Sequence, residues 1–303
     1  MKLIFDTDPG VDDALAILYA ALEPEIEILG MTTVFGNVTV EQATRNALHL
    51  AERIGRDIPV AQGAARPLHL PPFTPSHHVH GPEGFGDLPA TQPRRAAEPM
   101  DAADFLCQAV RAHPGEVVIC PIGPITNLAE AIARDTDFIR NVGRIVLMGG
   151  ALDVPGNITP HAEANTYHDP HALDLVLASG APITMVGLDV TLQVLLTQPD
   201  FDHLARVDAQ NGAFLRDMGR FYLNFYRSIG LEGCGLHDPM AVIAAQHPDW
   251  FTAEMTPLEV VLEGEAIGRT RRSAADRPPV EVMLDCDAAR IRAHFLERFA
   301  QVG

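Results

Sequence analysis

Short apolar runs alternate with stretches of helical periodicity along most of this 303-residue chain. Such runs are typical of parallel strands buried on both faces, and the helical stretches between them suit right-handed crossovers. The pattern therefore predicts an α/β fold with an open, mostly parallel sheet flanked by helices. Strands are predicted at residues 3–5, 26–34, 58–60, 117–120, 144–148, 183–186, 258–262 and 280–284. Helices are predicted at residues 12–21, 41–53, 101–112, 127–134, 170–178 and 288–300, and residues 198–246 are predicted to be mostly helical.

The length and the hydrophobic content of 47% allow the chain to bury a large core. One large domain or two smaller ones would both fit these values. No glycine-serine tract or charge run marks a linker, and the sequence shows no internal repeat. We therefore predict a single domain over residues 1–303.

The chain is strongly acidic, with 40 acidic against 22 basic side chains and a formal charge of -18. Nucleic acids and anionic membranes are poor partners for such a surface. The first residues lack the regions of a signal peptide, and no segment is long and apolar enough to span a bilayer. The cysteines are scattered without a CxxC pair, which suits reduced core thiols in a cytoplasmic protein. They are Cys107, Cys120, Cys234 and Cys286.

The first predicted strand ends in a cluster of four acids, Asp6, Asp8, Asp12 and Asp13. Open α/β sheets bind ligands at the carboxyl ends of their strands, so Asp6 and Asp8 are expected to point into a crevice. Asp12 and Asp13 fall in the first turn of the next helix, where acids are common without any ligand. Four crowded carboxylates repel one another unless a cation or protons neutralise them, and oxygen ligands suit Ca²⁺ or Mg²⁺ better than zinc. An EF-hand is excluded, because Val11 and Ile17 occupy the positions of its turn glycine and bidentate glutamate.

A long segment at residues 67–99 is rich in proline, glycine and histidine, including His77, His78 and His80. Ordered loops of this length are usually functional lids or rims, although a solvated surface loop is the plainer alternative. Clustered histidines also fit a separate zinc site, which is the weaker interpretation beside the oxygen ligands of the aspartates.

Two further polar clusters follow predicted strands or open predicted helices. Asn157, Glu163 and Asn165 supply donors and acceptors suited to the hydroxyls of a sugar, although each alone is a common turn residue. His237 and Asp238 open a helical run, where such a pair usually caps the helix. Beside a carboxylate site this pair could instead supply a metal ligand and a proton donor.

The acidic segment at residues 6–13 resembles the N-terminal signature of the inosine-uridine preferring nucleoside hydrolases. Further blocks match that family in the same order, and the resemblance runs from about Leu3 to the final helix. These blocks are residues 34–37, 121–128, 146–150, 162–165 and 237–239. The resemblance implies the Rossmann-like nucleoside hydrolase fold and hydrolysis of the N-glycosidic bond of ribonucleosides to base and ribose. It also implies a role in nucleoside salvage or catabolism.

The resemblance implies one tightly bound Ca²⁺ and a general base that activates the attacking water. Its expected ligands are the carboxylates of Asp8, Asp13 and Asp238 and the backbone carbonyl of Ile122. Asp8 is similar to the family's general base, and His237 resembles the residue proposed to protonate the departing base. The transition state would be oxocarbenium-like, with positive charge on the ribosyl ring.

The family pattern also suggests residues that bind the nucleoside. The expected contacts are Asp12, Asn37 and Asn165 with ribose hydroxyls, Asn157 and Glu163 with the 5′-hydroxyl, Met148 beside the ribosyl ring, His80 with the base, and Tyr222 and Tyr226 near His237. Ala164 departs from the aromatic residue that the family often has there, which leaves the choice between purine and pyrimidine open. Resemblance further suggests a homodimer or homotetramer.

Two other functions fit parts of the sequence. A strand that ends in Asp-x-Asp also resembles the haloacid dehalogenase-like Mg²⁺ phosphatases, with Asp6 as nucleophile and Asp8 as acid. That chemistry needs a cation on the phosphate, but Lys2 is the only lysine and the site blocks contain no arginine. A non-catalytic nucleoside or sugar-binding protein on the same fold is the second alternative, and the presence of both Asp8 and His237 argues against it.

Overall fold

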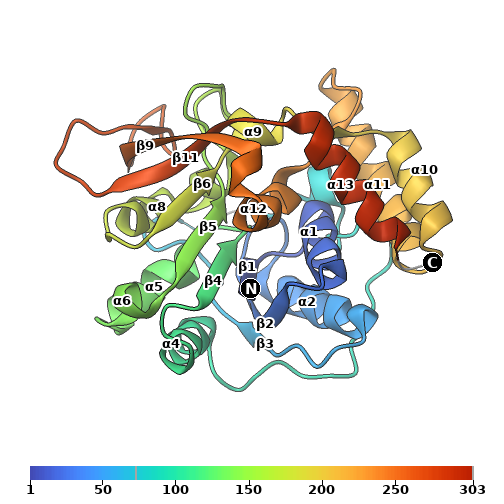
Figure 1. Ribbon diagram of the computed structural model, residues 1–303, viewed down its shortest axis with the longest axis horizontal. Coiled ribbons are helices and arrows are strands. Elements are labelled where there is room, and N and C mark those ends of the chain that lie inside the picture. Colours follow the sequence, from blue (N-terminus) through green and yellow to red (C-terminus); the bar gives the residue numbers. More distant parts are fainter. Residues whose placement is uncertain (72–73, 302–303) are drawn as a thin grey trace.

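A nine-stranded sheet runs through the computed structural model, which describes residues 1–71 and 74–301 (Figure 1). Its strand order is β10-β9-β11-β6-β5-β4-β1-β2-β3. Neighbouring strands are parallel from β3 through to β11, and β9 and β10 continue the sheet by antiparallel pairing. The strands are β1 (Lys2–Thr7), β2 (Glu27–Thr33), β3 (Val60–Gln62), β4 (Val117–Pro121), β5 (Arg144–Met148), β6 (Ile183–Val186), β9 (Phe251–Val260), β10 (Thr270–Arg272) and β11 (Pro279–Cys286). A separate two-stranded ribbon pairs β7 (Leu195–Leu196) with β8 (Cys234–Gly235).

Helices cover both faces of this sheet (Figure 1). One layer contains α4 (Ala102–Ala112), α5 (Thr126–Arg134), α6 (Phe138–Asn141) and α8 (Pro170–Leu177). The other contains α1 (Val11–Leu22), α2 (Val40–Ile54), α10 (Gln198–Val207), α11 (Asn211–Ser228), α12 (His237–Gln246) and α13 (Ala288–Ala300). The short helices are α3 (His77–His80), α7 (Ala164–His168), α9 (Leu188–Thr191) and the 3-10 turn η1 (Pro248–Trp250).

The central strand β1 shows how the two layers share one sheet. Its side chains alternate between the faces, so Leu3 and Phe5 pack into one hydrophobic core and Ile4 into the other. All three are fully buried, as expected for a parallel strand covered by helices on both sides. The predicted α/β fold with a mostly parallel, helix-flanked sheet is confirmed.

The position of β1 also fixes where a ligand can bind. The chain passes outward from β1 to β2 and β3, and then returns to place β4 on the opposite side of β1. Crossovers on the two sides of such a switch point diverge, which opens a crevice beyond the carboxyl ends of the strands. The acids that follow β1 lie at this switch point, where the Ile122 backbone donates to the carbonyl of Asp6 at 2.8 Å.

Most predicted elements are present within a few residues, but the last part of the sheet differs. The strand predicted at residues 258–262 begins earlier, as β9, and β10 was not predicted. The first half of β9 is largely exposed and pairs antiparallel with β11, so it lacks the continuous apolar run of a strand buried on both faces.

The C-terminal helix α13 packs against the C-terminal end of α1 and contacts Glu23, the residue after that helix. Glu23, which is only 2% exposed, forms an ion pair with Arg298 at 2.7 Å and contacts His294 at 3.1 Å. Phe295 and Phe299 of the same helix are fully buried in the core. Among the described residues, no helix is long and apolar enough to cross a membrane.

Candidate active site

A cavity of about 490 Å³ lies at the carboxyl ends of the central strands. This volume falls within the range of small-molecule binding sites. Its wall includes these residues named from the sequence: Asp12, Asn37, His80, Ile122, Met148, Asn157, Glu163, Asn165, Tyr222, Tyr226, His237 and Asp238. Asp8 and Asp13 lie behind this wall and are fully buried. The fold therefore brings together, around one cavity, segments from residue 8 to residue 238.

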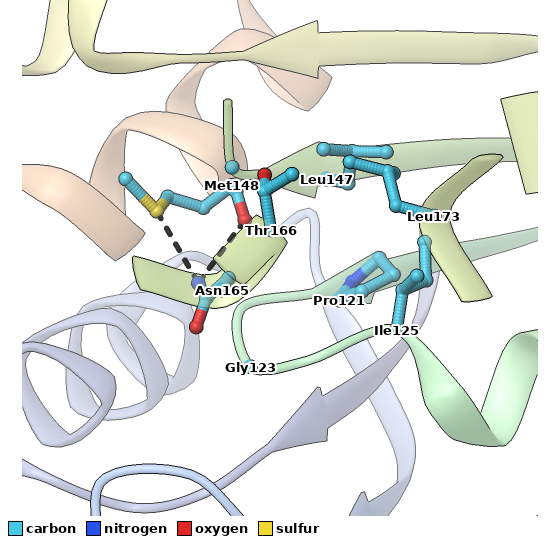
Figure 2. Close-up of a pocket in the computed structure, with 9 residues that line it drawn as sticks. Pro121, Gly123, Ile125, Leu147, Met148, Asn165, Thr166 and Leu173 are labelled. Carbon is cyan, nitrogen blue, oxygen red and sulfur yellow. Dashed lines mark hydrogen bonds between the residues drawn. The ribbon is translucent and has the colours of Figure 1, made fainter. Parts of the chain in front are cut away.

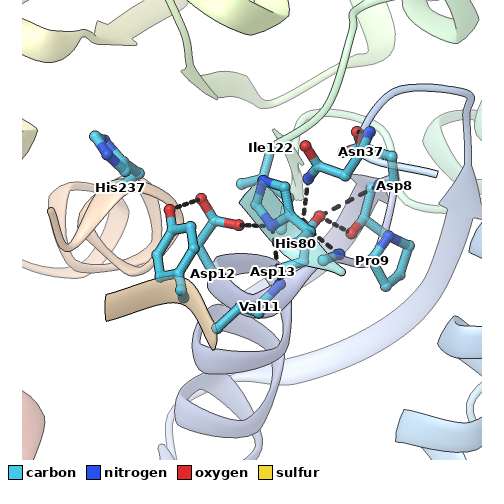
Figure 3. A network of polar contacts seen from close by, with 12 residues as sticks. Asp8, Pro9, Val11, Asp12, Asp13, Asn37, His80, Ile122 and His237 are labelled. Carbon is cyan, nitrogen blue, oxygen red and sulfur yellow. Dashed lines mark hydrogen bonds and ion pairs between the residues drawn. The ribbon is translucent and has the colours of Figure 1, made fainter. Parts of the chain in front are cut away.

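Asp8 and Asp13 are held by the first turn of α1 and by the loop after β2 (Figure 3). Gly10 donates its backbone N–H to Asp13 Oδ2 at 2.8 Å, so this acid also caps its own helix. Asn37 donates its backbone N–H to Asp8 Oδ2 at 2.5 Å and its side-chain amide to Asp13 Oδ2 at 3.1 Å. Asp8 lies in a space that exists because Gly36 and Gly123 have no side chains, since a Cβ on either would fall within 2.4 Å of its carboxylate oxygens.

Carboxylate oxygens of Asp12, Asp13 and Asp238 all lie within 4.8 Å of one another. One oxygen each of Asp8, Asp12 and Asp238 is buried without a hydrogen-bond partner among the described residues. Burial raises the pKa of Asp13 to about 7, with the charge of Asp12 adding to the effect. Burial also raises the pKa of Asp8 and of Asp238 well above the usual range, and the surrounding carboxylates contribute. Buried, unpaired acids of this kind fit a divalent cation held by oxygen.

This cluster of three carboxylates, from Asp12, Asp13 and Asp238, does not have the same members as the predicted set of metal ligands. Asp12, which was expected to contact ribose, is a member of the group, and Asp8 stands outside it. Asp8 Oδ2 accepts the backbone N–H of Asn37, and its Oδ1 has no hydrogen-bond partner among the described residues.

Asp6 does not point into the cavity, and this part of the prediction was wrong. Its side chain accepts hydrogen bonds from Thr32 at 2.6 Å and from Asn127 at 2.7 Å in a fully buried position. Asp6 still belongs to β1, whereas the strand ends at Thr7 and the chain turns before Asp8. Asp6 therefore ties β1 to β2 and α5, and burial raises its pKa to about 7.

His80 reaches the site from the proline-rich segment, whose short helix α3 forms part of the rim. Its Nδ1 accepts the backbone N–H of Val11 at 3.3 Å, which places the ring proton on Nε2. Burial lowers the pKa of His80, so the ring is neutral, and its 3.6 Å approach to Asp12 is not an ion pair. The segment therefore forms part of the rim and contributes two histidines to the cavity wall, His78 and the neutral His80.

His237 begins α12 and stands at one end of a chain of hydroxyl groups. Its Nε2 lies 2.6 Å from the Tyr226 hydroxyl, and its Nδ1 lies 2.8 Å from the Thr191 hydroxyl. Tyr226 in turn lies 3.4 Å from Tyr222, which donates to Asp12 Oδ2 at 2.9 Å. Burial lowers the pKa of His237. The histidine and the carboxylate group are thus joined through two tyrosines of α11.

Glu163 and Asn165, at the start of α7, form another part of the wall. Glu163 caps α7 by accepting the backbone N–H groups of Asn165 and Thr166, and it also accepts from Gly150 at 3.0 Å. The Asn165 amide donates to the carbonyls of Ile122 and Met148, at 3.0 and 3.2 Å. Because both contacts use the amide nitrogen, the side-chain oxygen of Asn165 remains the group available to a ligand.

A small void of about 10 Å³ lies behind this wall, between Asn165 and the apolar side chains of β5 and α8 (Figure 2). Leu147, Ile125 and Leu173 lie on one side of it, and Met148 and Asn165 lie on the other (Figure 2). It is too small for a ligand larger than about one water molecule. The small void therefore belongs to the packing behind the site.

The sequence did not identify most of the apolar wall of the cavity. Its members are Val79, Ile158, Leu192, Phe225, Ile229 and Leu231. Spacing of three or four residues places Tyr222, Phe225, Tyr226 and Ile229 on one helical face, which was the available signal. Thr191 was also missed, because nothing in its local sequence distinguishes it from an ordinary buried threonine.

Comparison with known proteins gives consistent matches over nearly the whole chain. The family model for the inosine-uridine preferring nucleoside hydrolases matches residues 3–293. Uridine nucleosidase 1 of Arabidopsis thaliana is 45% identical over 271 residues, which are 89% of this chain and 81% of that protein. A solved plant nucleoside hydrolase superposes with a TM-score of 0.96 at 38% identity and covers 99% of this chain and 98% of its own.

A purine-preferring ribonucleoside hydrolase from Gardnerella vaginalis also has a TM-score of 0.96 and 38% identity, covering 100% of this chain and 99% of its own. The chain is thus similar in sequence to a uridine nucleosidase and in structure to a purine-preferring hydrolase. These matches show that the chain belongs to the inosine-uridine preferring nucleoside hydrolase family.

Proposed function

We propose that this ribonucleoside hydrolase cleaves the N-glycosidic bond with calcium bound at the cluster of Asp12, Asp13 and Asp238 carboxylates. In this proposal Asp8 is the general base and His237 is the general acid. The observation that carries the proposal is the cavity itself. The carboxylates of Asp12 and Asp238 line it together with the hydroxyl-linked His237, and those of Asp8 and Asp13 are buried behind its wall. Hydrolysis adds a hydroxyl group to C1′ of ribose and a proton to the departing base, so it needs a base and an acid at separate positions.

The family is metal-dependent, and Asp12, Asp13 and Asp238 form an acidic cluster that could hold the ion. The three carboxylates supply hard oxygen ligands, and the unpartnered oxygen of Asp8 adds a further donor. We propose Ca²⁺, held by Asp13, Asp238, Asp8 and the carbonyl of Ile122, with Asp12 close beside them. When bound, the ion would polarise the attacking water and hold ribose hydroxyls.

Asp8 is proposed to take the proton of the attacking water. Its carboxylate is oriented by the Asn37 backbone, and its second oxygen has no partner among the described residues. A pKa raised by burial makes Asp8 a stronger base than an exposed carboxylate. Its surroundings therefore suit proton abstraction.

His237 is proposed to protonate the base as the bond between C1′ and the base nitrogen breaks and its electron pair remains on the base. The lowered pKa of His237 makes the protonated ring a stronger acid than an exposed histidine. Tyr226 shares a hydrogen bond with it at the cavity wall. Proton donation compensates for the poor leaving ability of a nucleobase.

The remaining wall residues are proposed to bind the nucleoside. The Asn165 oxygen, Asn37 and Asp12 would contact ribose hydroxyls, and the amide nitrogen of Asn157 would donate to the 5′-hydroxyl. Glu163 is better suited to hold α7 and Asn165 than to accept a ligand, because its two oxygens already accept four hydrogen bonds. His80 and the apolar wall would surround the base, and Met148 would face the ribosyl ring.

The arrangement does not favour a phosphatase. Asp6, the nucleophile in that interpretation, lies outside the cavity wall, and none of the described lining residues is an arginine or lysine. We further propose a single catalytic domain, a role in nucleoside salvage or catabolism, a cytoplasmic location and a homodimer or homotetramer.

The deciding experiment measures ribose released from uridine and inosine by the purified, calcium-loaded enzyme. Asp8→Asn should retain the fold and lose about 10²–10⁴-fold or more in turnover, the range for loss of a general base. Asp249→Asn, on the exposed surface of η1, serves as the control and should retain wild-type turnover. Absence of ribose release from both nucleosides would leave a binding protein as the better interpretation.

A further inference from the structure

The hydroxyl chain that joins His237 to Asp12 can satisfy all of its links in only one direction. Asp12, as a carboxylate, can only accept, so the single proton of Tyr222 is committed to it. The Tyr222 oxygen must therefore accept from Tyr226 across their 3.4 Å contact. The proton of Tyr226 is then committed in turn, and its oxygen must accept from His237 at 2.6 Å.

This direction requires the proton of His237 to lie on Nε2. A neutral imidazole carries one N–H and one acceptor nitrogen, so Nδ1 must accept. The partner of Nδ1 is the Thr191 hydroxyl at 2.8 Å, a group that can donate. In the opposite direction Tyr226 would donate to Nε2, and no proton would remain for the pair of tyrosine oxygens.

We propose that Thr191 is a positioning residue that fixes His237 in the Nε2–H tautomer, with that proton directed to Tyr226 and the cavity. Thr191 is fully buried in α9, and its hydroxyl lies on the side of the ring opposite Tyr226. Both ring nitrogens of His237 are hydrogen-bonded, so a flip of the ring would break the contacts with Thr191 and with Tyr226. A Cβ at Gly235 would fall 2.7 Å from Nε2, so this glycine leaves room for the ring in the observed orientation.

The consequence for the reaction rests on the proposed role of His237 as the acid. The acid itself is the imidazolium, formed when Nδ1 takes up a second proton. In that state Nδ1–H donates to the Thr191 hydroxyl oxygen and the ring keeps its orientation, so Nε2–H already faces Tyr226 and the cavity. Transfer of that proton to the leaving base leaves a neutral ring that still donates from Nδ1 to Thr191. Loss of the Thr191 hydroxyl would release Nδ1, and both tautomers and other ring orientations would become populated. Departure of a natural base should then slow, whereas water activation at Asp8 should be unaffected.

The test compares Thr191→Val, which has nearly the same shape without the hydroxyl, with Thr191→Ser, which retains the hydroxyl. With calcium-loaded enzyme, Thr191→Val should lower kcat for uridine or inosine about 10-fold, roughly the value of one lost hydrogen bond, with little change in KM. Turnover of p-nitrophenyl riboside, whose phenolate departs unprotonated, should change less than 2-fold by the same reasoning. Thr191→Ser should restore most of the lost kcat.

Thr184→Val is the matched control, because Thr184 is a buried threonine of the adjacent strand β6 whose hydroxyl donates to Glu281. It should leave the ratio of the two substrate rates unchanged. Equal losses on both substrates in Thr191→Val, or no recovery in Thr191→Ser, would mean that Thr191 only supports the packing, and the inference would fall.

A second measurement does not depend on activity. Nitrogen-15 NMR of histidine-labelled, calcium-loaded protein distinguishes the two neutral tautomers, and a His237→Ala sample assigns the signal. The wild-type signal should show a protonated Nε2 and an accepting Nδ1, and Thr191→Val should shift it toward a mixture. A protonated Nδ1 in the wild type would overturn the tautomer assignment even in an active enzyme. Failure of the proposed function would appear separately, as absent nucleoside turnover with the tautomer intact.

Discussion

Asn37 holds Asp8 in place with its backbone nitrogen, which lies 2.5 Å from the Asp8 carboxylate. The approach is possible because the preceding residue is glycine. A Cβ at Gly36 would lie 1.8 Å from Asp8 Oδ2, well inside any allowed contact. The loop after β2 thus sets the position of an acid that belongs to the loop after β1.

Gly36→Ala should therefore displace the Asp8 carboxylate and reduce turnover about 10²-fold or more, since errors near 1 Å in a reacting group have effects of this size. Steady-state rates on uridine and inosine, with circular dichroism to check folding, would measure this. Gly264→Ala is the control: Gly264 is exposed, nothing lies within 4 Å of an added Cβ there, and its φ of +79° should cost some stability but leave the rates unchanged. A folded Gly36→Ala enzyme with wild-type rates would show that Asp8 tolerates other positions.

Chelation should inactivate and destabilise the protein. The carboxylates of Asp12, Asp13 and Asp238 repel one another when no cation is present, and a bound ion at 100 times its Kd adds about 2.7 kcal/mol to the free energy of unfolding. EDTA should therefore lower both turnover and Tm, and added Ca²⁺ should restore both.

Asp238→Asn provides the matched variant for the metal site. It should lose the calcium-dependent rise in Tm, while its Tm in EDTA should equal or exceed that of the wild type, because one buried charge has been removed. An unchanged response to calcium in Asp238→Asn would place the ion elsewhere.

His237→Ala should separate leaving-group protonation from water activation. Turnover of inosine should fall about 10²-fold or more, as expected for loss of a general acid, while p-nitrophenyl riboside should be barely affected. Steady-state kinetics with both substrates would measure this ratio. Comparable losses on the two substrates would indicate that His237 shapes the site without donating a proton.

Stability should depend on pH through His168. Burial lowers the pKa of this histidine to about 3, below the roughly 6.5 of an unfolded histidine. Between these pH values the unfolded chain binds a proton at His168 that the folded chain does not bind. The free energy of unfolding therefore decreases as the pH falls from about 6.5 toward the folded-state pKa. The slope is at most about 1.4 kcal/mol per pH unit.

Urea unfolding of His168→Gln and wild type at several pH values would check this expectation. The difference in unfolding free energy between the two proteins should shrink, or change in favour of the variant, as the pH falls from about 6.5 toward 4. Substitution of the exposed His77 by Gln should leave the wild-type pH dependence in place. Parallel pH curves for His168→Gln and wild type would disprove the role of His168.

The sequence predicted those parts of the site that depend on strand ends and helix starts. Asp13 and Asp238 lie in first helical turns, where they were expected, and Asn157 and Glu163 lie on the loop after β5. These features are local, because the carboxyl ends of parallel strands share one edge of the sheet.

Other features depend on geometry that no local pattern records. Asp6 lies inside β1, whereas Asp8 lies just beyond the end of the strand. This difference in position explains why the Asp8 side chain lies beside the cavity and the Asp6 side chain does not. The partnership of Thr191 with His237 joins residues 46 positions apart. The exposed start of β9 was missed for a different reason, since it lacks an apolar run.

The ion pair between Glu23 and Arg298 holds the C-terminal end of α1, the helix whose first turn carries Asp12 and Asp13. Asp12 and Asp13 occupy the first turn of α1, and Glu23 directly follows its last residue. A chain shortened after residue 293 would keep every described residue that lines the cavity. It would nevertheless expose the buried end of α1 and leave the Glu23 carboxylate without the guanidinium of Arg298. Resistance of the active site to heat would then be limited by a helix that never touches the nucleoside.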